Sequence, residues 1–62
     1  MKNKNFMKRL VAYMIYKLCK RMIEKENYES VEDMMEKIAV FNLRGILSDD
    51  EMNELLDMLE DK

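Results

Sequence analysis

Few side chains in this sequence are suited to catalysis: there is one cysteine, a set of carboxylates, and no histidine. Without histidine the chain lacks the commonest general base, and Cys/His nucleophile pairs and Cys/His zinc sites are excluded. Cys19 precedes Lys20, and a nearby cation can lower the pKa of a thiol. Its position at the edge of an apolar helical arc favours instead a small buried hydrophobe. A single cysteine also excludes an intrachain disulfide.

The adjacent carboxylates of Asp49-Asp50-Glu51 are the other group that could do chemistry, as a cation site or as acid–base catalysts. The segment lacks the alternating acids and central glycine of an EF-hand calcium loop. Ser48 and Glu51 instead form the S-x-x-E pattern that caps the start of a helix. A chain of 62 residues rarely encloses the concave pocket that paired catalytic carboxylates need. We therefore expect no enzymatic activity, no metal site and no cofactor.

Methionine and tyrosine point to contacts rather than catalysis. The chain has eight methionines, and this flexible side chain suits either an adaptable partner-binding surface or a core in which it replaces leucine. Six recur at core-type helical spacing, which favours the core: Met7, Met14, Met22, Met34, Met35 and Met52. Tyr13 and Tyr16 flank basic positions, where they could stack on nucleic-acid bases or lie at an interface with a buried ring and a hydrated hydroxyl.

The elements that position these residues are predicted to be three helices. The sequence has no proline and one glycine, and its spacing of apolar residues predicts helices at about residues 6–25, 31–43 and 49–60. Asn27 and Gly45 are expected to end the first two helices in a left-handed conformation, and Ser30 and Ser48 to cap the last two. The predicted fold is all-α: one domain with a long helix and a short antiparallel hairpin, which forms an intermolecular helical bundle.

The first predicted helix is apolar over too much of its circumference to pack only within one small chain. On a helical wheel, the apolar residues of 6–23 cover roughly 220°, whereas a stripe of about 100° is enough to face one core. Each large side chain left in water forfeits about 1.5–3 kcal/mol. We therefore predict a homodimer. Its interface is predicted to contain Phe6, Met7, Leu10, Val11, Met14, Ile15, Leu18 and Met22.

Charge is divided unevenly along the chain. Residues 1–25 carry eight Lys or Arg and one acid, Glu24, whereas residues 26–62 carry three Lys or Arg and twelve acids. The basic part could bind nucleic acid or an anionic membrane surface. The near cancellation of the two parts favours instead their packing on each other, within one chain or across the dimer. The candidate basic face contains Lys8, Arg9, Lys17, Lys20, Arg21 and Lys25.

Neither membrane insertion nor export is predicted. The longest uncharged run, Leu10–Tyr16, is far shorter than the ~20 residues that a spanning helix needs. Lys17, Lys20 and Arg21 interrupt the apolar run and no small-residue cleavage site follows, so a secretory signal is not expected. A lone cysteine is typical of a reducing compartment. We expect a cytoplasmic protein.

The segments Tyr28–Met34 (YESVEDM) and Leu43–Met52 (LRGILSDDEM) resemble short proteins of Gram-positive bacteria and their prophages, of the XkdX type and with SHOCT-like C-terminal modules. In those proteins a helix ends in a G-x-[IL]-[ST]-x-x-[EQ] turn before a last short helix; Met52 stands where an aromatic residue is common. The resemblance covers residues 28–59 and supplies no catalytic residues. It implies a phage or prophage setting and an accessory or assembly role.

These observations together favour a small non-enzymatic interaction or assembly protein that self-associates and has a possible further protein partner. The alternative is a binder of anionic membrane surfaces or nucleic acid that uses the basic first helix. Neither the composition nor the motifs identify a specific partner.

Overall fold

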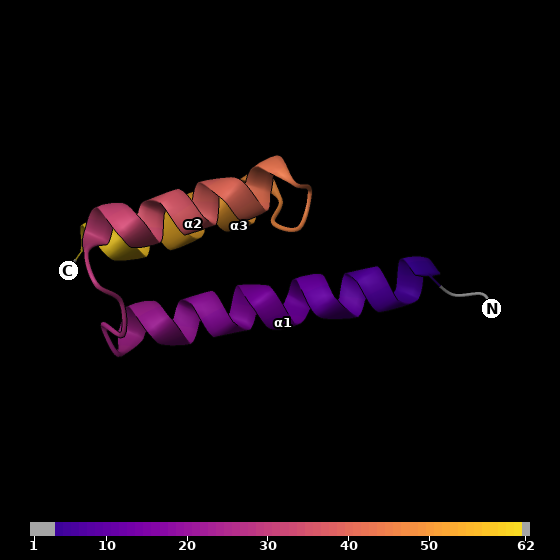
Figure 1. The fold of residues 1–62 in the computed structure, drawn as a ribbon, viewed down its shortest axis with the longest axis horizontal. Helices are drawn as coiled ribbons and strands as arrows, with labels where there is room; N and C mark the ends of the chain where they lie inside the picture. The colour runs from indigo at the N-terminus through magenta and orange to yellow at the C-terminus, as the bar shows by residue number, and fades with distance from the viewer. Residues whose placement is uncertain (1–3, 62) are drawn as a thin grey trace.

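The computed structural model describes the backbone of residues 4–61 and the side chains of residues 7–61. Within this range the chain forms three helices, α1 (Lys4–Glu24), α2 (Val31–Leu43) and α3 (Asp49–Glu60), and no strand (Figure 1). The prediction of an all-α chain with three helices is confirmed. α2 and α3 have the bounds that their capping residues indicate, whereas α1 begins at residue 4 rather than 6 and ends at 24 rather than 25.

The end of α1 is a Schellman turn whose left-handed residue is Glu26. The Asn27 amide donates to the Met22 carbonyl at 2.8 Å, and the Glu26 amide donates to the Ile23 carbonyl at 3.1 Å. This pair of hydrogen bonds requires positive φ at the residue before Asn27, and Glu26 has a φ of 53°. The prediction that Asn27 ends the first helix in a left-handed conformation is therefore wrong. Asparagine tolerates positive φ better than glutamate, but the hydrogen bonds of the turn require positive φ at Glu26, one position earlier.

The end of α2 repeats this turn with glycine in the left-handed position. The Gly45 amide donates to the Asn42 carbonyl at 2.9 Å, and the Ile46 amide donates to the Phe41 carbonyl at 2.9 Å. Gly45 has a φ of 80°, a conformation in which a residue without Cβ is unstrained. The prediction that Gly45 ends the second helix is confirmed.

The start of α3 has the full capping box that the sequence indicates. The Ser48 hydroxyl accepts from the Glu51 amide at 3.1 Å, and the Glu51 carboxylate accepts from the Ser48 amide at 2.9 Å. The Asn42 side-chain amide connects the two helices, because it donates at 2.9 Å both to the Leu47 carbonyl and to the Asp49 carboxylate. The turn between α2 and α3 is thus held by hydrogen bonds at both ends.

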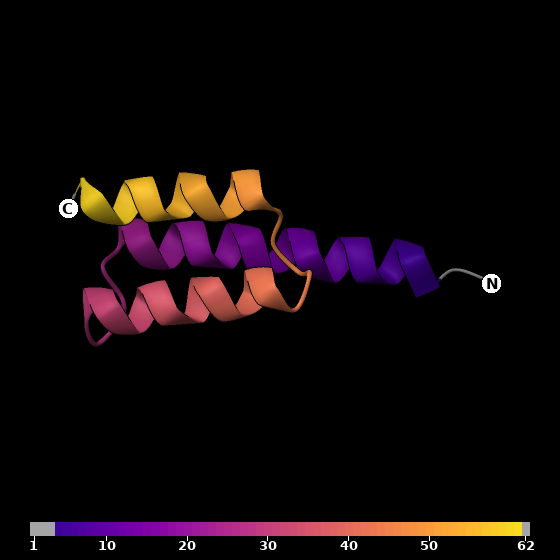
Figure 2. The same cartoon turned by 90° about the horizontal axis from the view of Figure 1, so that it is seen from above.

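The three helices lie roughly parallel to one another, with α2 antiparallel to α1 and α3. Figure 1 shows α1 along one side of the α2–α3 hairpin, and Figure 2, turned by 90°, shows it between the two hairpin helices. α3 packs on both α1 and α2. Because α1 has 21 residues and its neighbours 13 and 12, its N-terminal part extends past the hairpin.

One small buried core holds the helices together, and every helix contributes to it. Its members are Cys19, Ile23, Met34, Ile38, Leu47, Leu55 and Leu59. Among the described residues no polar or charged side chain is buried. Full burial of such a side chain contributes about 1.5–3 kcal/mol, most of which is offset by the entropy of ordering the chain. The fold therefore depends on a few apolar contacts.

Candidate interaction surface

α1 has two apolar sides, and the hairpin covers only one of them. The covered side carries Ile15, Cys19 and Ile23, and the last two are core residues. The other side carries five large apolar residues, each about half exposed or more. We call them the open apolar face: Met7 (64% exposed), Leu10 (49%), Val11 (51%), Met14 (59%) and Leu18 (52%). The excess apolar width of α1 is therefore on the surface of the single chain.

The fold divides the predicted dimer interface. Five of its eight members form the open apolar face, whereas Ile15 and Met22 pack against the core of their own chain. The side chain of Phe6 lies outside the described residues. The surface left for another molecule is therefore narrower than the helical wheel suggests, because the hairpin covers one edge of the arc.

The methionines are divided in the same way. Four lie in the core or against it: Met22, Met34, Met52 and Met58. Met7, Met14 and Met35 are exposed. The prediction that the methionines lie in the core thus holds for only some of them. Met7 and Met14 instead give the open apolar face flexible side chains, which can adapt to the shape of a partner.

Cys19 behaves as a small buried apolar group. Its side chain is 3% exposed, and burial raises the pKa of its thiol above the ordinary value. This direction is opposite to the activation that Lys20 could provide; the Lys20 ammonium lies beside Glu54 instead. A protonated, buried thiol is a poor nucleophile, so the structural interpretation of Cys19 is the better one.

Tyr16 and Lys20 of α1 form a polar cluster with Glu54 of α3. The Tyr16 hydroxyl donates to the Glu54 carboxylate, 2.8 Å from Oε1 and 2.7 Å from Oε2. Lys20 Nζ lies 3.4 Å from Glu54 Oε2 and 5.5 Å from the centre of the Tyr16 ring. The hydrogen bond from Tyr16 lowers the pKa of Glu54, and hydrogen bonding to Glu54 raises the pKa of both Tyr16 and Lys20. Basic and acidic parts of the chain therefore meet at this contact.

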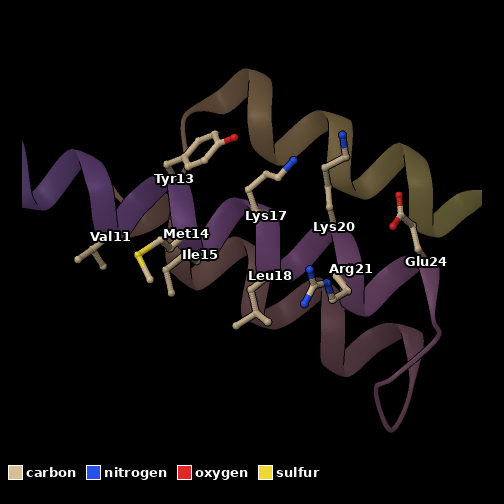
Figure 3. A pocket seen from close by; sticks show the side chains of 9 residues that line it. All are labelled: Val11, Tyr13, Met14, Ile15, Lys17, Leu18, Lys20, Arg21 and Glu24. Atoms are coloured by element: carbon tan, nitrogen blue, oxygen red, sulfur yellow. The ribbon is translucent and has the colours of Figure 1, made fainter.

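The remaining members of the predicted basic face stay on the surface of α1 and of the turn that follows it. Lys20 points toward α3 in Figure 3, whereas five cations are exposed: Lys8, Arg9, Lys17, Arg21 and Lys25. Lys17 Nζ lies 5.9 Å from the centre of the Tyr13 ring. The sequence of α1 contains a single acid, Glu24. The open apolar face thus lies among exposed positive charges.

Two surface grooves follow the open apolar face and share Val11. The first has a volume of about 640 Å³ and includes Met14 and Leu18, which point to one side of α1 in Figure 3. The second, of about 470 Å³, lies between the N-terminal part of α1 and the α2–α3 turn, and Lys8 and Arg44 line it. No acidic side chain lines the second groove. Apolar and basic side chains line both grooves, and Glu24 also lines the first.

A second exposed surface lies on α2, and it is not among the surfaces predicted from the sequence. Glu32, Glu36, Val40 and Leu43 recur at i, i+4, i+8 and i+11, so they form one stripe of the helix. We call it the outer α2 stripe. All four side chains are exposed, Val40 to 39% and Leu43 to 86%. The sequence signal that could have indicated this stripe is the pair Val40 and Leu43, two apolar residues on the side of the helix away from the core.

Other kinds of site receive no support from the described residues. Within them, no three Cys, Asp or Glu side chains lie together in a way that could hold a metal ion. None of the described helices combines the length and apolarity needed to cross a membrane. The exposed side of α3 includes Asp57 and Glu60, which would repel phosphate if α3 approached DNA. The geometry thus defines a small three-helix protein with an exposed apolar surface on its longest helix.

Comparisons of the chain with protein-family models, curated proteins and solved structures found no match. The resemblance of residues 28–59 to short phage-associated proteins therefore stays a prediction.

Proposed function

We propose that this protein is a small non-enzymatic interaction module that assembles with other copies of itself through the open apolar face of α1. The observation that carries the proposal is the exposure of five large apolar side chains, 49% to 64% each, on the side of α1 that the hairpin leaves uncovered. Contiguous apolar surface of this kind is typical of protein interaction sites. The resemblance of residues 28–59 supports an assembly role in a phage or prophage setting.

The expected affinity follows from the size of the face. Moving five half-exposed side chains out of water contributes about 1 kcal/mol each, half of the value for full burial. The apolar groups of the partner contribute a similar amount, and association costs at least about 4 kcal/mol in lost freedom of motion. We therefore expect a dissociation constant of roughly 1–100 µM, and an equilibrium that depends on protein concentration.

Sedimentation velocity over a dilution series tests the proposal. The double substitution Met14→Gln/Leu18→Gln removes apolar surface from the open face and should weaken association at least about tenfold. Val31→Gln/Met35→Gln is the matched control, because these residues are also four apart and exposed, at 39% and 42%, but lie outside both surfaces defined above. A wild-type protein that remains monomeric at high concentration would contradict the proposal.

A second candidate function is binding to an anionic membrane surface or to nucleic acid. The exposed cations Lys8, Arg9 and Lys17 beside an apolar stripe support it, because basic amphipathic helices bind such surfaces. A monomer that binds phosphatidylserine vesicles or duplex DNA in a strongly salt-dependent manner would favour this candidate over self-association. Absence of binding at low salt would eliminate it.

A further inference from the structure

We propose that the C-terminal part of the open apolar face of one copy, Met14 and Leu18, receives the outer α2 stripe of a second copy, with the two helices antiparallel. This inference rests on the self-association proposed above and specifies its geometry. On α1, Met14, Leu18, Arg21 and Lys25 recur at i, i+4, i+7 and i+11 and therefore share one side of the helix and of the turn that follows it. All four are exposed, and the order along the chain is apolar and then basic.

The outer α2 stripe has the complementary order. Glu32 and Glu36 come first and Val40 and Leu43 follow, so this stripe is acidic and then apolar. Because the orders are opposite, an antiparallel pairing sets apolar against apolar and basic against acidic. A parallel pairing would set the acidic end against Met14 and Leu18.

The spacing of the two stripes also matches. Each covers the same number of positions, residues 14–25 along α1 and the start of the turn after it, and residues 32–43 on α2. One antiparallel register therefore gives four opposed pairs: Met14 with Leu43, Leu18 with Val40, Arg21 with Glu36, and Lys25 with Glu32 of the second copy. The apolar pairs supply most of the attraction. The exposed ion pairs add only about 0.2–1 kcal/mol each, but they select the register and disfavour alternatives.

A symmetric contact between two α1 helices lacks this match. A pairing of this kind brings together residues 7–23 of two helices, whose exposed charges are all positive, among them Lys8, Lys17 and Arg21. The sequence of residues 7–23 contains no acid that could separate these charges. Like charges brought together at an interface are unfavourable, so α2 of the second copy is the better occupant.

A charge-exchange experiment tests the geometry. Variant A carries Arg21→Glu and Lys25→Glu, and variant B carries Glu32→Lys and Glu36→Lys. Alone, each variant opposes like charges in the proposed register and should associate at least about tenfold more weakly than wild type. In an equimolar mixture, α1 of A faces α2 of B with exchanged signs, and α1 of B faces α2 of A with native signs. The mixture should therefore form a mixed A–B assembly with close to wild-type affinity, measured by native mass spectrometry and sedimentation.

The control distinguishes register from net charge. Variant C carries Asp57→Lys and Glu60→Lys on the exposed side of α3 and has the same net charge as B. C should self-associate like wild type. With A it can form only one favourable contact, α1 of C against α2 of A, so the A–C mixture should associate more weakly than the A–B mixture, in which both contacts are favourable. Circular dichroism checks that each variant keeps its helices. If B unfolds, Glu32→Gln/Glu36→Gln replaces it, with a smaller loss of affinity expected.

The outcomes separate the two proposals. A monomeric wild-type protein would contradict self-association as such. Wild-type assembly together with unchanged self-association of B would overturn only the α1–α2 geometry, and would indicate a contact between two α1 helices. Rescue of A by C to the same extent as by B would show that net charge alone controls association and would also overturn the proposed register.

Discussion

The hydroxyl of Tyr16 donates a hydrogen bond to the carboxylate of Glu54, 38 residues further along the chain, and lies 2.8 Å from Oε1 and 2.7 Å from Oε2. This hydrogen bond connects α1 to α3 beside a core of a few apolar residues. Because the open apolar face gives α1 no support within one chain, the contacts on its covered side determine where α1 lies. Tyr16 and Glu54 therefore affect how the candidate interaction surface is presented.

Replacing Tyr16 with phenylalanine should destabilise the protein without changing its helices. The ring stays in place, but the Glu54 carboxylate loses its hydrogen-bond donor. We expect a lower midpoint of urea unfolding with an unchanged slope. Tyr13→Phe is the matched control, because Tyr13 is 55% exposed on the same helix. Equal midpoints for the two variants would show that the Tyr16 hydrogen bond contributes nothing measurable.

The contribution of the Tyr16–Lys20–Glu54 cluster should depend on pH at both ends of the scale. The pKa of Glu54 is lowered from 4.5 in the folded protein. The ionised carboxylate therefore adds to the free energy of unfolding above pH 4.5, and this addition is lost as the pH falls through the lowered pKa. The pKa values of Tyr16 and Lys20 are raised from 10.0 and 10.5, so their contributions are present below those values and are lost as the pH rises through the raised ones.

Urea unfolding of wild type and Glu54→Gln from about pH 3 to about pH 11 checks this dependence. The difference in stability between the two proteins should be largest in the middle of the range and should decrease toward both ends. Because both proteins share the other carboxylates, the effect of those groups on stability cancels in the difference between the two proteins. A difference that stays constant across the whole range would contradict the assignment.

Gly45→Ala should destabilise the protein by about 1 kcal/mol. Gly45 has a φ of 80°, and a Cβ placed there would meet no atom within 4 Å. The whole cost therefore comes from the left-handed backbone and none from a steric clash. Thermal or urea unfolding measures it, with Arg44→Ala as a control at the preceding exposed position. A stability equal to that of wild type would mean that the turn rearranges.

Glycine at position 26 should have the opposite effect. Glu26 adopts a φ of 53° at the equivalent position after α1. We expect Glu26→Gly to be more stable than Glu26→Ala by about 1 kcal/mol, because both variants lack the carboxylate and differ only in their tolerance of positive φ. Unfolding in urea measures the difference. An alanine variant as stable as the glycine variant would show that this turn does not hold the residue in the left-handed region.

The two sides of α1 should respond differently to truncation. Ile23 is fully buried, so Ile23→Ala should cost about 2–5 kcal/mol. Leu18 is 52% exposed, so Leu18→Ala should change the stability of the dilute monomer by well under about 1 kcal/mol. Unfolding at a concentration below that of self-association compares them. A large loss for Leu18→Ala under these conditions would mean that the open apolar face is covered within one chain.

Features that depend on a few neighbouring residues could be predicted from the sequence. The capping box of Ser48 and Glu51, the cap at Ser30 and the turn at Gly45 are local hydrogen-bonding patterns, and each is present in the structure. The exception is the end of α1, where the sequence predicts Asn27 as the left-handed residue and the structure has Glu26, one position earlier. The apolar excess of α1 was also predictable, because it follows from helical periodicity alone.

Features that depend on where the hairpin packs could not be read from the sequence. The helical wheel places Ile15 and Leu18 on one arc, but the hairpin covers the first and leaves the second exposed. The charge pattern groups Lys20 with the other cations, but the position of α3 brings it to Glu54. The sequence thus determined three helices and one helix with surplus apolar surface. The tertiary structure decided which part of that surface remains open, because burial depends on contacts between segments far apart in the chain.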